Sequence, residues 1–353
     1  MHEFDFANRT NALLSPEIVG LLTRIHEFRG KQALMLDAKP EVLSNLHEFA
    51  ILQSTDASCK IAGICTDDER LELLVREKTR PVNRDEQAIA GYRDALAQIH
   101  ENYAYIPPNP GSLIQLHRDL YKYTGLEGGH YRVNDDANID IISSGDGKNR
   151  FRPVSAGETA GCMDALCDAW AKAVADETLD PLLLMPSFIL DFLCVQPFAE
   201  GNWRMSCLLT LLLLNRAGYV VGGYVSVERL IERTRQRYFD ALAASVAGWH
   251  ENANDYAPFT QYLLEIILTA YQELAERVEA LSVESVSKPG RVRAVIKDAV
   301  SQITKAEIMR RCPDISQITV QRALNELQRT GEIVKLGGGR YTAYKWNQEE
   351  KQP

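Results

Sequence analysis

Residues 181–214 read PLLLMPSFILDFLCVQPFAEGNWRMSCLLTLLLL. Two strongly apolar stretches at helical spacing flank a short polar turn at 196–204. Leucines occupy every side of the second stretch, so we expect that helix to be deeply buried. Polar groups in a turn between two buried helices cost free energy unless they have partners. The sequence therefore predicts that something occupies this turn.

The turn carries groups that can hold an anion. The first backbone N–H groups of a helix beginning near Arg204 lack intrahelical acceptors, and the helix dipole is positive there. Gly201 lets a ligand approach the backbone, Asn202 can cap the helix, and Arg204 offers donors suited to phosphate. Glu200 beside a phosphate would be repulsive unless a hard cation such as Mg²⁺ lies between them. From these residues alone, an ordinary capped helix start with a Glu–Arg pair is the alternative.

Helical periodicity on both sides of the turn predicts an all-α body. Apolar residues recur at helical spacing over 16–36, 40–53, 84–103, 112–123, 156–175, 181–195, 204–217, 227–249 and 258–281. Residues 138–153 differ, because three isoleucines there precede a glycine-containing turn at 144–148. That pattern is typical of a β-hairpin.

Charge divides the chain into an acidic body and a basic tail. The net charge of the 353 residues is −9. Residues 285–353 hold thirteen Lys and Arg against seven Asp and Glu, whereas the remainder holds 26 against 41. The tail is thus +6 and the body −15, which indicates two units with different partners, joined by a linker at 282–290. The acidic body argues against nucleic acid as its own ligand.

The tail has the element order of a winged helix-turn-helix. Three helical patterns and two strand-like runs follow one another at 291–300, 304–311, 319–329, 333–336 and 341–345. In that geometry the third helix enters the DNA major groove and brings Gln321, Arg322 and Asn325 near the bases. Arg340 on the wing would meet phosphate. A protein-contact module that uses the same fold is the alternative.

Several classes of protein are excluded. The seven cysteines form no Cys-x-x-Cys pair, so we expect reduced thiols in a cytoplasmic protein. The apolar stretches are too short or too interrupted to span a bilayer, and no secretory signal pattern begins the chain. No P-loop, dinucleotide-binding or His-Glu-x-x-His motif occurs. We expect no contact with a membrane.

Residues 196–207 resemble the motif of the Fic (Fido-domain) family, His-Pro-Phe-x-(Asp/Glu)-Gly-Asn-Gly-Arg-x-x-Arg, without a gap. The matching positions are Pro197, Phe198, Glu200, Gly201, Asn202 and Arg204. Similarity extends to 116–117, 129–132, 150–154 and 248–259, and the tail resembles the winged helix of many bacterial members. The resemblance implies an all-α Fic core with a β-hairpin flap. The domains it implies are an N-terminal helical region at 1–110, a Fic core at 111–284 with the flap at 138–153, and a winged helix at 288–350.

The family transfers a nucleotide monophosphate, usually AMP from ATP, to a hydroxyl group of a protein. The resemblance implies that Glu200 binds Mg²⁺, that the loop at 201–202 holds the anion, and that Arg204 binds phosphate. It implies that Tyr238 and Phe239 line an adenine pocket. The flap would align a target protein as an added strand. The sequence leaves open whether the chain forms a homodimer.

Three residues depart from the motif. Gln196 replaces the general-base histidine, and because an amide has no basic lone pair at neutral pH, this loss typically costs about 10²–10⁴-fold in rate. Trp203 replaces the second glycine, and we expect its indole to restrict or fill the nucleotide site. Cys207 replaces the last arginine and removes a cation that would hold the triphosphate.

Residues 58–63 resemble the inhibitory helix of the family, (Ser/Thr)-x-x-x-Glu-(Gly/Asn). Ser58 and Gly63 match, whereas Ala62 stands in place of Glu. In the family that Glu pairs with the last motif arginine, so both halves of the pair are absent here, at Ala62 and Cys207. We therefore predict a Fic protein that is weak or inactive in AMP transfer and that binds an anion, a nucleotide or a protein. The alternatives are an active nucleotidyl- or phosphoryl-transferase with a non-standard base and a ligand-sensing DNA-binding regulator.

Overall fold

The computed structural model describes residues 2–37, 40–135, 151–284, 288–299, 301–339 and 342–347. The regular elements among these residues are helices apart from one small sheet, which confirms the predicted all-α fold class. The chain divides into two units, Met1–Leu274 and Ala275–Pro353.

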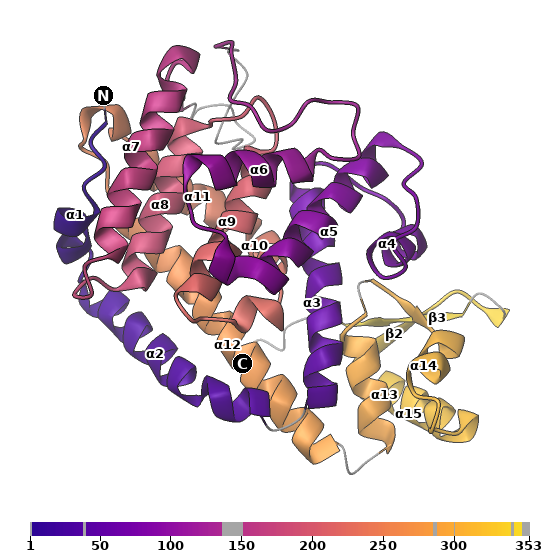
Figure 1. The fold of residues 1–353 in the computed structure, drawn as a ribbon. Coiled ribbons are helices and arrows are strands. Elements are labelled where there is room, and N and C mark those ends of the chain that lie inside the picture. The colour runs from indigo at the N-terminus through magenta and orange to yellow at the C-terminus, as the bar shows by residue number, and fades with distance from the viewer. Residues whose placement is uncertain are drawn as a thin grey trace. The chain divides into compact units, whose positions relative to one another are not determined.

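In the described part of the first unit the regular elements are all helices, drawn in indigo to orange in Figure 1. They are α1 (Phe6–Ala12), α2 (Pro16–Asp37), α3 (Pro40–Ile61), α4 (Asp68–Val75), α5 (Arg84–Asn102), α6 (Pro110–Leu120), α7 (Ala156–Val174), α8 (Pro181–Val195), α9 (Asn202–Arg216), α10 (Val227–Arg233), α11 (Arg235–Val246) and most of α12 (Ala257–Glu284). The division between the units falls within α12, ahead of the linker predicted at 282–290.

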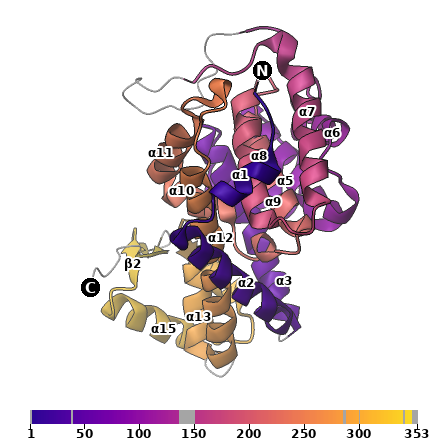
Figure 2. The same cartoon turned by 90° about the vertical axis from the view of Figure 1, so that its left-hand side faces the viewer.

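Helices α8 and α9 form the centre of this unit. Residues 182–195 of α8 are all buried, and in α9 the residues from Arg204 to Asn215 are buried as well. Helix α7 packs on α8 and α5 packs on α9, while α1 lies against α7 and α8 (Figure 2). Because both helices are covered on all sides, the polar turn that joins them is set at the edge of a dry core.

Local side chains set where several of these helices begin. Asn83 before α5, Asn109 before α6 and Asp180 before α8 each accept a backbone N–H of the first turn. Proline is the first residue of both α6 and α8, where its fixed φ and missing N–H cost nothing.

The helix predicted over 227–249 is wrong as a single element, because it breaks into α10 and α11 at Thr234. The Thr234 hydroxyl lies 2.9 Å from the Leu230 carbonyl oxygen, to which it donates, and 2.7 Å from the Tyr262 hydroxyl. Such a local bond competes with the helical backbone pattern. Helices α1 and α4 were not expected from the periodicity.

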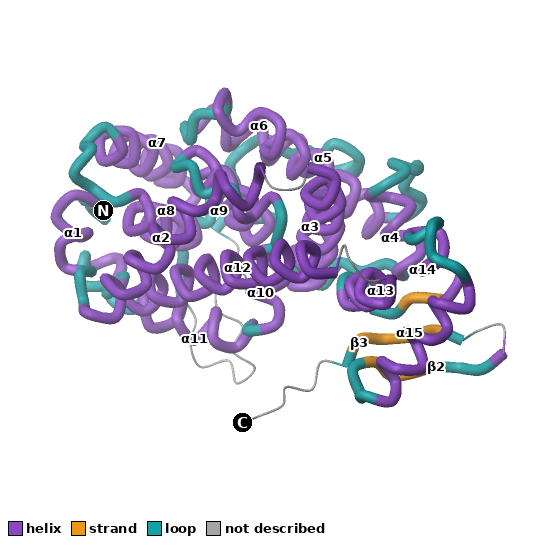
Figure 3. The backbone as a smooth tube through the Cα atoms, turned by 90° about the horizontal axis from the view of Figure 1, so that it is seen from below, coloured by secondary structure: helices purple, strands orange, loops and turns teal. Residues whose placement is uncertain are grey.

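In its described residues the second unit contains the end of α12, three further helices and a three-stranded sheet (Figure 3). The further helices and the strands are α13 (Lys288–Lys297), β1 (Ile303–Thr304), α14 (Lys305–Arg311), α15 (Gln317–Arg329), β2 (Ile333–Leu336) and β3 (Ala343–Trp346). The strands are antiparallel in the order β1-β3-β2. This order matches that expected of a winged helix-turn-helix, with β1 as an unpredicted third strand. The unit has its own core, which includes Val292, Ile308, Val320 and Leu324.

Two predicted features fall outside the described residues. Most of the flap at 138–153 lies there, with only its end at 151–153 described, and so does Arg340 of the wing. Among the helices that are described, none combines the length and the apolar character needed to cross a membrane.

Candidate anion-binding site

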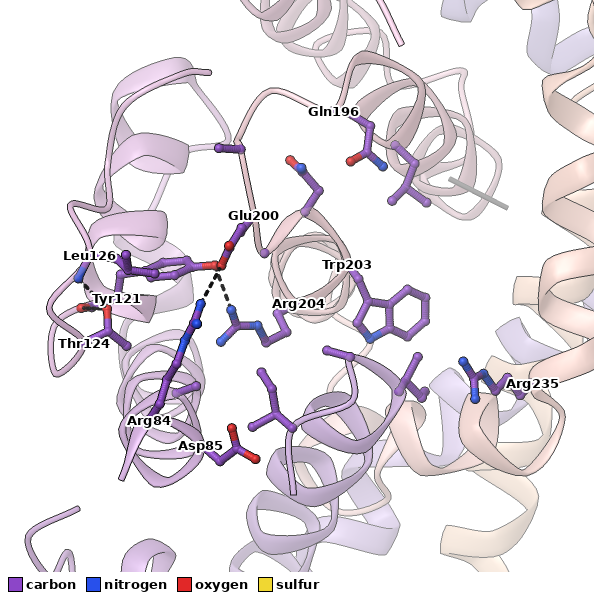
Figure 4. A pocket seen from close by; sticks show the side chains of 18 of the residues that line it. Arg84, Asp85, Tyr121, Thr124, Leu126, Gln196, Glu200, Trp203, Arg204 and Arg235 are labelled. Carbon is purple, nitrogen blue, oxygen red and sulfur yellow. Dashed lines mark hydrogen bonds and ion pairs between the residues drawn. The ribbon is translucent and has the colours of Figure 1, made fainter. Parts of the chain in front are cut away.

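A pocket of about 690 Å³ opens at the turn between α8 and α9 (Figure 4). Its walls come from this turn, the first residues of α5 and α9, the segments after α3 and α6, and α11. A volume of this size is typical of small-molecule sites. The predicted site residues that line it are Ala62, Gln196, Glu200, Gly201, Asn202, Trp203, Arg204, Tyr238 and Phe239.

The backbone of the turn is left-handed at both ends. Gln196 has φ 47° and Gly201 has φ 81°. A Cβ on Gly201 would lie 3.0 Å from the Tyr121 hydroxyl oxygen and 3.1 Å from its ring. The backbone conformation and the close approach of Tyr121 therefore require glycine here. The predicted approach of a ligand would be a further reason.

Asn202 closes the turn on itself. Its Oδ1 accepts the Phe198 backbone N–H at 3.0 Å, and its Nδ2 donates to the Phe198 carbonyl at 2.7 Å. The expectation that Asn202 caps the helix is thus corrected. It is the first residue of α9, and Gly201 precedes the helix. The amide instead satisfies two buried backbone groups that would otherwise have no partner.

His117 supports the turn from α6. Its Nδ1 accepts the Gly129 N–H at 2.9 Å, so the proton lies on Nε2, which donates to the Glu200 carbonyl oxygen at 3.1 Å. The imidazole stacks on the Phe198 ring with centroids 3.7 Å apart. Burial lowers the pKa of His117 to about 4, which keeps the ring neutral at physiological pH.

Arg132 holds the other end of the turn. Its Nε donates to the Gln196 carbonyl at 2.8 Å, and its backbone N–H donates to the Pro197 carbonyl at 2.9 Å. The same guanidinium donates to the Val154 carbonyl. Because Arg132 is buried and binds consecutive carbonyls, it fixes the path of the chain where α8 ends.

Arg204 is buried with unused donors. The side chain is 4% exposed, and its Nη2 donates to the Tyr121 hydroxyl at 2.9 Å. Its Nε and Nη1 have no hydrogen-bond partner within the described part of the chain. A buried charged donor without an acceptor is costly. Guanidinium geometry matches that of phosphate, and Arg204 lines the pocket, so these donors are suited to an anion that reaches the guanidinium.

Trp203 narrows the pocket without filling it. The indole packs edge-on against the Tyr238 ring with centroids 4.9 Å apart, and Tyr238 is itself buried. The cavity of about 690 Å³ lies beside this pair. The Trp203 Nε1 is buried and has no partner among the residues described.

Three charged residues of the pocket were not anticipated: Arg84, Asp85 and Arg235. The Arg84 Nη2 lies 3.5 Å from the Glu200 Oε2. The sequence signals a helix start at Asn83, but no spacing connects that start with Glu200, which is far along the chain.

Three predicted residues do not line the pocket: Ser58, Gly63 and Cys207. Ser58 is buried in α3, and Gly63 takes φ 75° in the turn that ends this helix. Cys207 is buried in the second turn of α9, where burial raises the pKa of its thiol well above the ordinary value. Of the three residues predicted in the segment that resembles the inhibitory helix, namely Ser58, Ala62 and Gly63, Ala62 therefore lines the pocket and the other two do not.

The sequence of this region matches a known family. Residues 107–214 match the Fic/DOC family model, which spans α6 to α9 and includes the turn, His117 and Arg204. This chain carries a Fic domain. The other elements that complete the pocket lie outside the matched residues; they are the end of α3 with the segment after it, the first residues of α5, and α11.

Solved Fic structures share the fold. A Fic family protein from Desulfovibrio desulfuricans superposes with a TM-score of 0.61 at 19% identity, covering 96% of this chain and 98% of that chain. A Fic domain containing signaling protein from Bacteroides thetaiotaomicron superposes with a TM-score of 0.61 at 19% identity, covering 72% of this chain and 98% of that chain. Fic-1 from C. elegans superposes with a TM-score of 0.59 at 19% identity, covering 79% of this chain and 77% of that chain. At this identity the similarity establishes the Fic fold only. No protein with a curated description matches the chain.

The Mg²⁺ ion implied by the Fic resemblance does not fit the carboxylates of this pocket. Glu200 stands at the motif position, but its Oε2 is paired with Arg84. Asp85, the other acidic residue lining the pocket, accepts the Cys65 backbone N–H at 3.2 Å. The described residues contain no group of three or more His, Cys, Asp or Glu side chains placed to hold a metal. A divalent ion would have to displace Arg84 from Glu200.

Proposed function

We propose that this Fic domain is an anion- or nucleotide-binding regulatory module with weak or no AMP transfer. One observation carries the proposal: the buried guanidinium of Arg204 lines the pocket with two donors that lack acceptors among the described residues. Retaining such donors costs stability in the free protein, and a bound phosphate would offset that cost.

The groups near the turn favour binding over transfer. Gln196 is 7% exposed at the position of the family histidine, and a carboxamide cannot accept a proton from an attacking hydroxyl at neutral pH. His117 does not replace the missing base, since its Nδ1 is occupied by the Gly129 N–H and its pKa is about 4. These features support a module that holds a phosphate group and releases it unchanged.

Thermal unfolding with and without ATP tests the binding. A ligand at 100 times its Kd stabilises the folded state by about 2.7 kcal/mol, so ATP should raise the Tm of the unaltered chain. Arg204→Met should abolish this response while leaving the free protein equally or more stable, because the unpaired donors are removed. Arg216→Met, at the other end of α9, is the control and should retain the response. An ATP response that survives in Arg204→Met would contradict the proposal.

Incubation with labelled ATP and Mg²⁺ tests the lack of transfer. We expect no self-labelling of the unaltered chain above background. The triple variant Gln196→His, Trp203→Gly, Cys207→Arg restores the family motif and should label more strongly. Label in the unaltered chain that disappears with Arg204→Met would support the alternative, an active transferase with a non-standard base.

A second candidate function is DNA binding by the second unit. Arg322 is exposed on α15, and beside it the Gln321 side chain accepts from Lys305 at 2.8 Å and donates to Asn325 at 3.0 Å. The unit is basic, and this polar row lies on the helix that would enter the major groove. Titration of a DNA duplex at several salt concentrations tests it. Arg322→Ala should weaken binding and reduce the salt slope by about 1, whereas Arg329→Ala should change little, because Arg329 already pairs with Glu326.

A further inference from the structure

We propose that Arg84 is the counter-cation of the anion pocket, so that phosphate binding at Arg204 needs no divalent metal ion. This inference rests on the proposed anion binding and adds the charge state of the ligand: a metal-free phosphate ester or polyphosphate. Figure 4 shows Arg84, Glu200 and Arg204 at one end of the pocket, with Trp203 and Arg235 toward the other.

The start of α5 places Arg84 firmly. The Asn83 side chain accepts the Glu86 N–H at 2.8 Å. The Glu86 carboxylate in turn accepts Arg70 at 3.0 and 2.6 Å and the Val82 N–H at 2.9 Å. These bonds fix the backbone of the first turn without using Arg84. Its long side chain is 73% exposed and pairs with Glu200, so it extends to the carboxylate beside which a ligand would lie.

Glu200 is the reason that a cation is needed. A phosphate bound to the Nε and Nη1 of Arg204 would lie in the same pocket as the Glu200 carboxylate, and the two negative charges would repel each other. A positive group between them removes the repulsion. The Arg84 Nη2, 3.5 Å from the Glu200 Oε2, already lies at that carboxylate.

A guanidinium can replace a divalent ion in this role. Its five N–H donors form a planar fork that can reach a carboxylate with one edge and a phosphate with the other. The positive end of the α5 dipole adds to the effect, since Arg84 and Asp85 of its first turn line the pocket. The side chains that line the pocket include three arginines against two carboxylates. The chain's own charges therefore favour an anion without a metal.

The Mg²⁺ dependence of binding distinguishes Arg84 from a metal ion. Titration of the full chain with ATP, followed by calorimetry, is carried out once with EDTA and once with Mg²⁺. We expect ATP to bind with EDTA at least as tightly as with Mg²⁺, because Mg²⁺ competes with Arg84 for Glu200 and for phosphate. Arg84→Ala should weaken binding in EDTA about tenfold or more and should make binding improve on addition of Mg²⁺.

Two further variants sharpen the experiment. Arg80→Ala, an exposed arginine just before α5 that does not line the pocket, is the control and should bind ATP as the unaltered chain does. Glu200→Gln removes the repelling charge and should tighten binding in EDTA, whereas a metal ligand at this position would make the same change weaken binding. Two outcomes would overturn the role of Arg84 but not the proposed function: ATP binding by the unaltered chain only with Mg²⁺, or weaker binding by Glu200→Gln. No binding under either condition would overturn the proposed function as well.

Discussion

At the scale of single residues, the proposed anion binding depends on Arg204. Its guanidinium is buried over the Tyr121 ring, with the guanidinium carbon 5.1 Å from the ring centroid, and makes one hydrogen bond to the hydroxyl of Tyr121. A purely structural arginine at this depth would have its remaining donors satisfied. Arg204 instead keeps two donors without partners among the described residues and lines the pocket, as the proposed binding of an anion requires.

Gly201 should not tolerate a side chain. Gly201→Ala places a Cβ 3.0 Å from the Tyr121 hydroxyl in a left-handed conformation, and we expect a loss of about 1–3 kcal/mol in the free energy of unfolding. Urea unfolding measures it. Gly157→Ala is the matched control, because Gly157 lies in α7 with open space around it, and this change should be neutral or stabilising. Equal effects of the two substitutions would contradict this account of the turn.

The depressed pKa of His117 predicts a pH dependence of stability. In the unfolded chain a histidine titrates near pH 6.5, whereas His117 in the folded chain titrates at about 4. Between these values the unfolded chain binds a proton that the folded chain does not, so the free energy of unfolding falls as the pH drops from about 6.5 to about 4.

His117→Phe tests that dependence. The variant keeps an aromatic ring next to Phe198 and removes the titrating group. It should be less stable at pH 7, because the Gly129 N–H and the Glu200 carbonyl lose their partners. Between pH 7 and pH 4.5 the free energy of unfolding of the variant should fall less than that of the unaltered chain, by about 2 kcal/mol. Parallel pH profiles of the two proteins, from urea unfolding, would rule out this role for His117.

At the scale of elements, a turn between two buried helices depends on groups supplied by other segments. The last carbonyl groups of α8 have no N–H donor within their own helix. Arg132, from the segment after α6, supplies donors to Gln196 and Pro197. The shape of the turn at the pocket thus depends on a residue outside α8 and α9.

Arg132→Met should disturb both stability and binding. It leaves buried carbonyls without donors, and we expect a loss of about 2–4 kcal/mol in the free energy of unfolding together with weaker ATP binding. Arg132→Lys should not restore either property, because one ammonium cannot reach the separate carbonyls that the fork of Arg132 reaches. Unfolding and ATP titration of the two variants measure this. Full recovery in Arg132→Lys would show that charge alone matters.

At the scale of the whole molecule, the two units have separate apolar cores. The core of the second unit consists of residues between Val292 and Tyr344. The first unit is centred on α8 and α9, whose residues are buried almost throughout. Separate cores predict separate cooperative unfolding.

Leu324→Ala tests that separation. Leu324 is fully buried in α15, and its truncation should cost the second unit about 2–5 kcal/mol. Hydrogen exchange should then show lost protection in α13 to α15 and unchanged protection in α8 and α9. Leu208→Ala in α9, which is equally buried, should give the reverse pattern. Loss of protection in both units from either change would contradict independent unfolding.

The amino-acid sequence alone predicts the helical fold class, the buried pair of helices and the motif turn between them. Each of these depends on neighbours in the chain: apolar spacing defines the helices, and the run from Pro197 to Arg204 defines the turn. The break at Thr234 was missed because it depends on one hydroxyl that bonds to its own helix and meets Tyr262. The short strand β1 was missed because it is only two residues long and is defined by its pairing with β3.

Which side chains share the pocket depends on how the helices pack in three dimensions. In the folded chain Arg84 pairs with Glu200, Tyr121 lies close to Gly201, and Cys207 does not line the cavity. Helix formation follows from local spacing and capping, which a sequence displays directly. Contacts between segments far apart in the chain follow from how whole helices pack, and no local pattern encodes that packing.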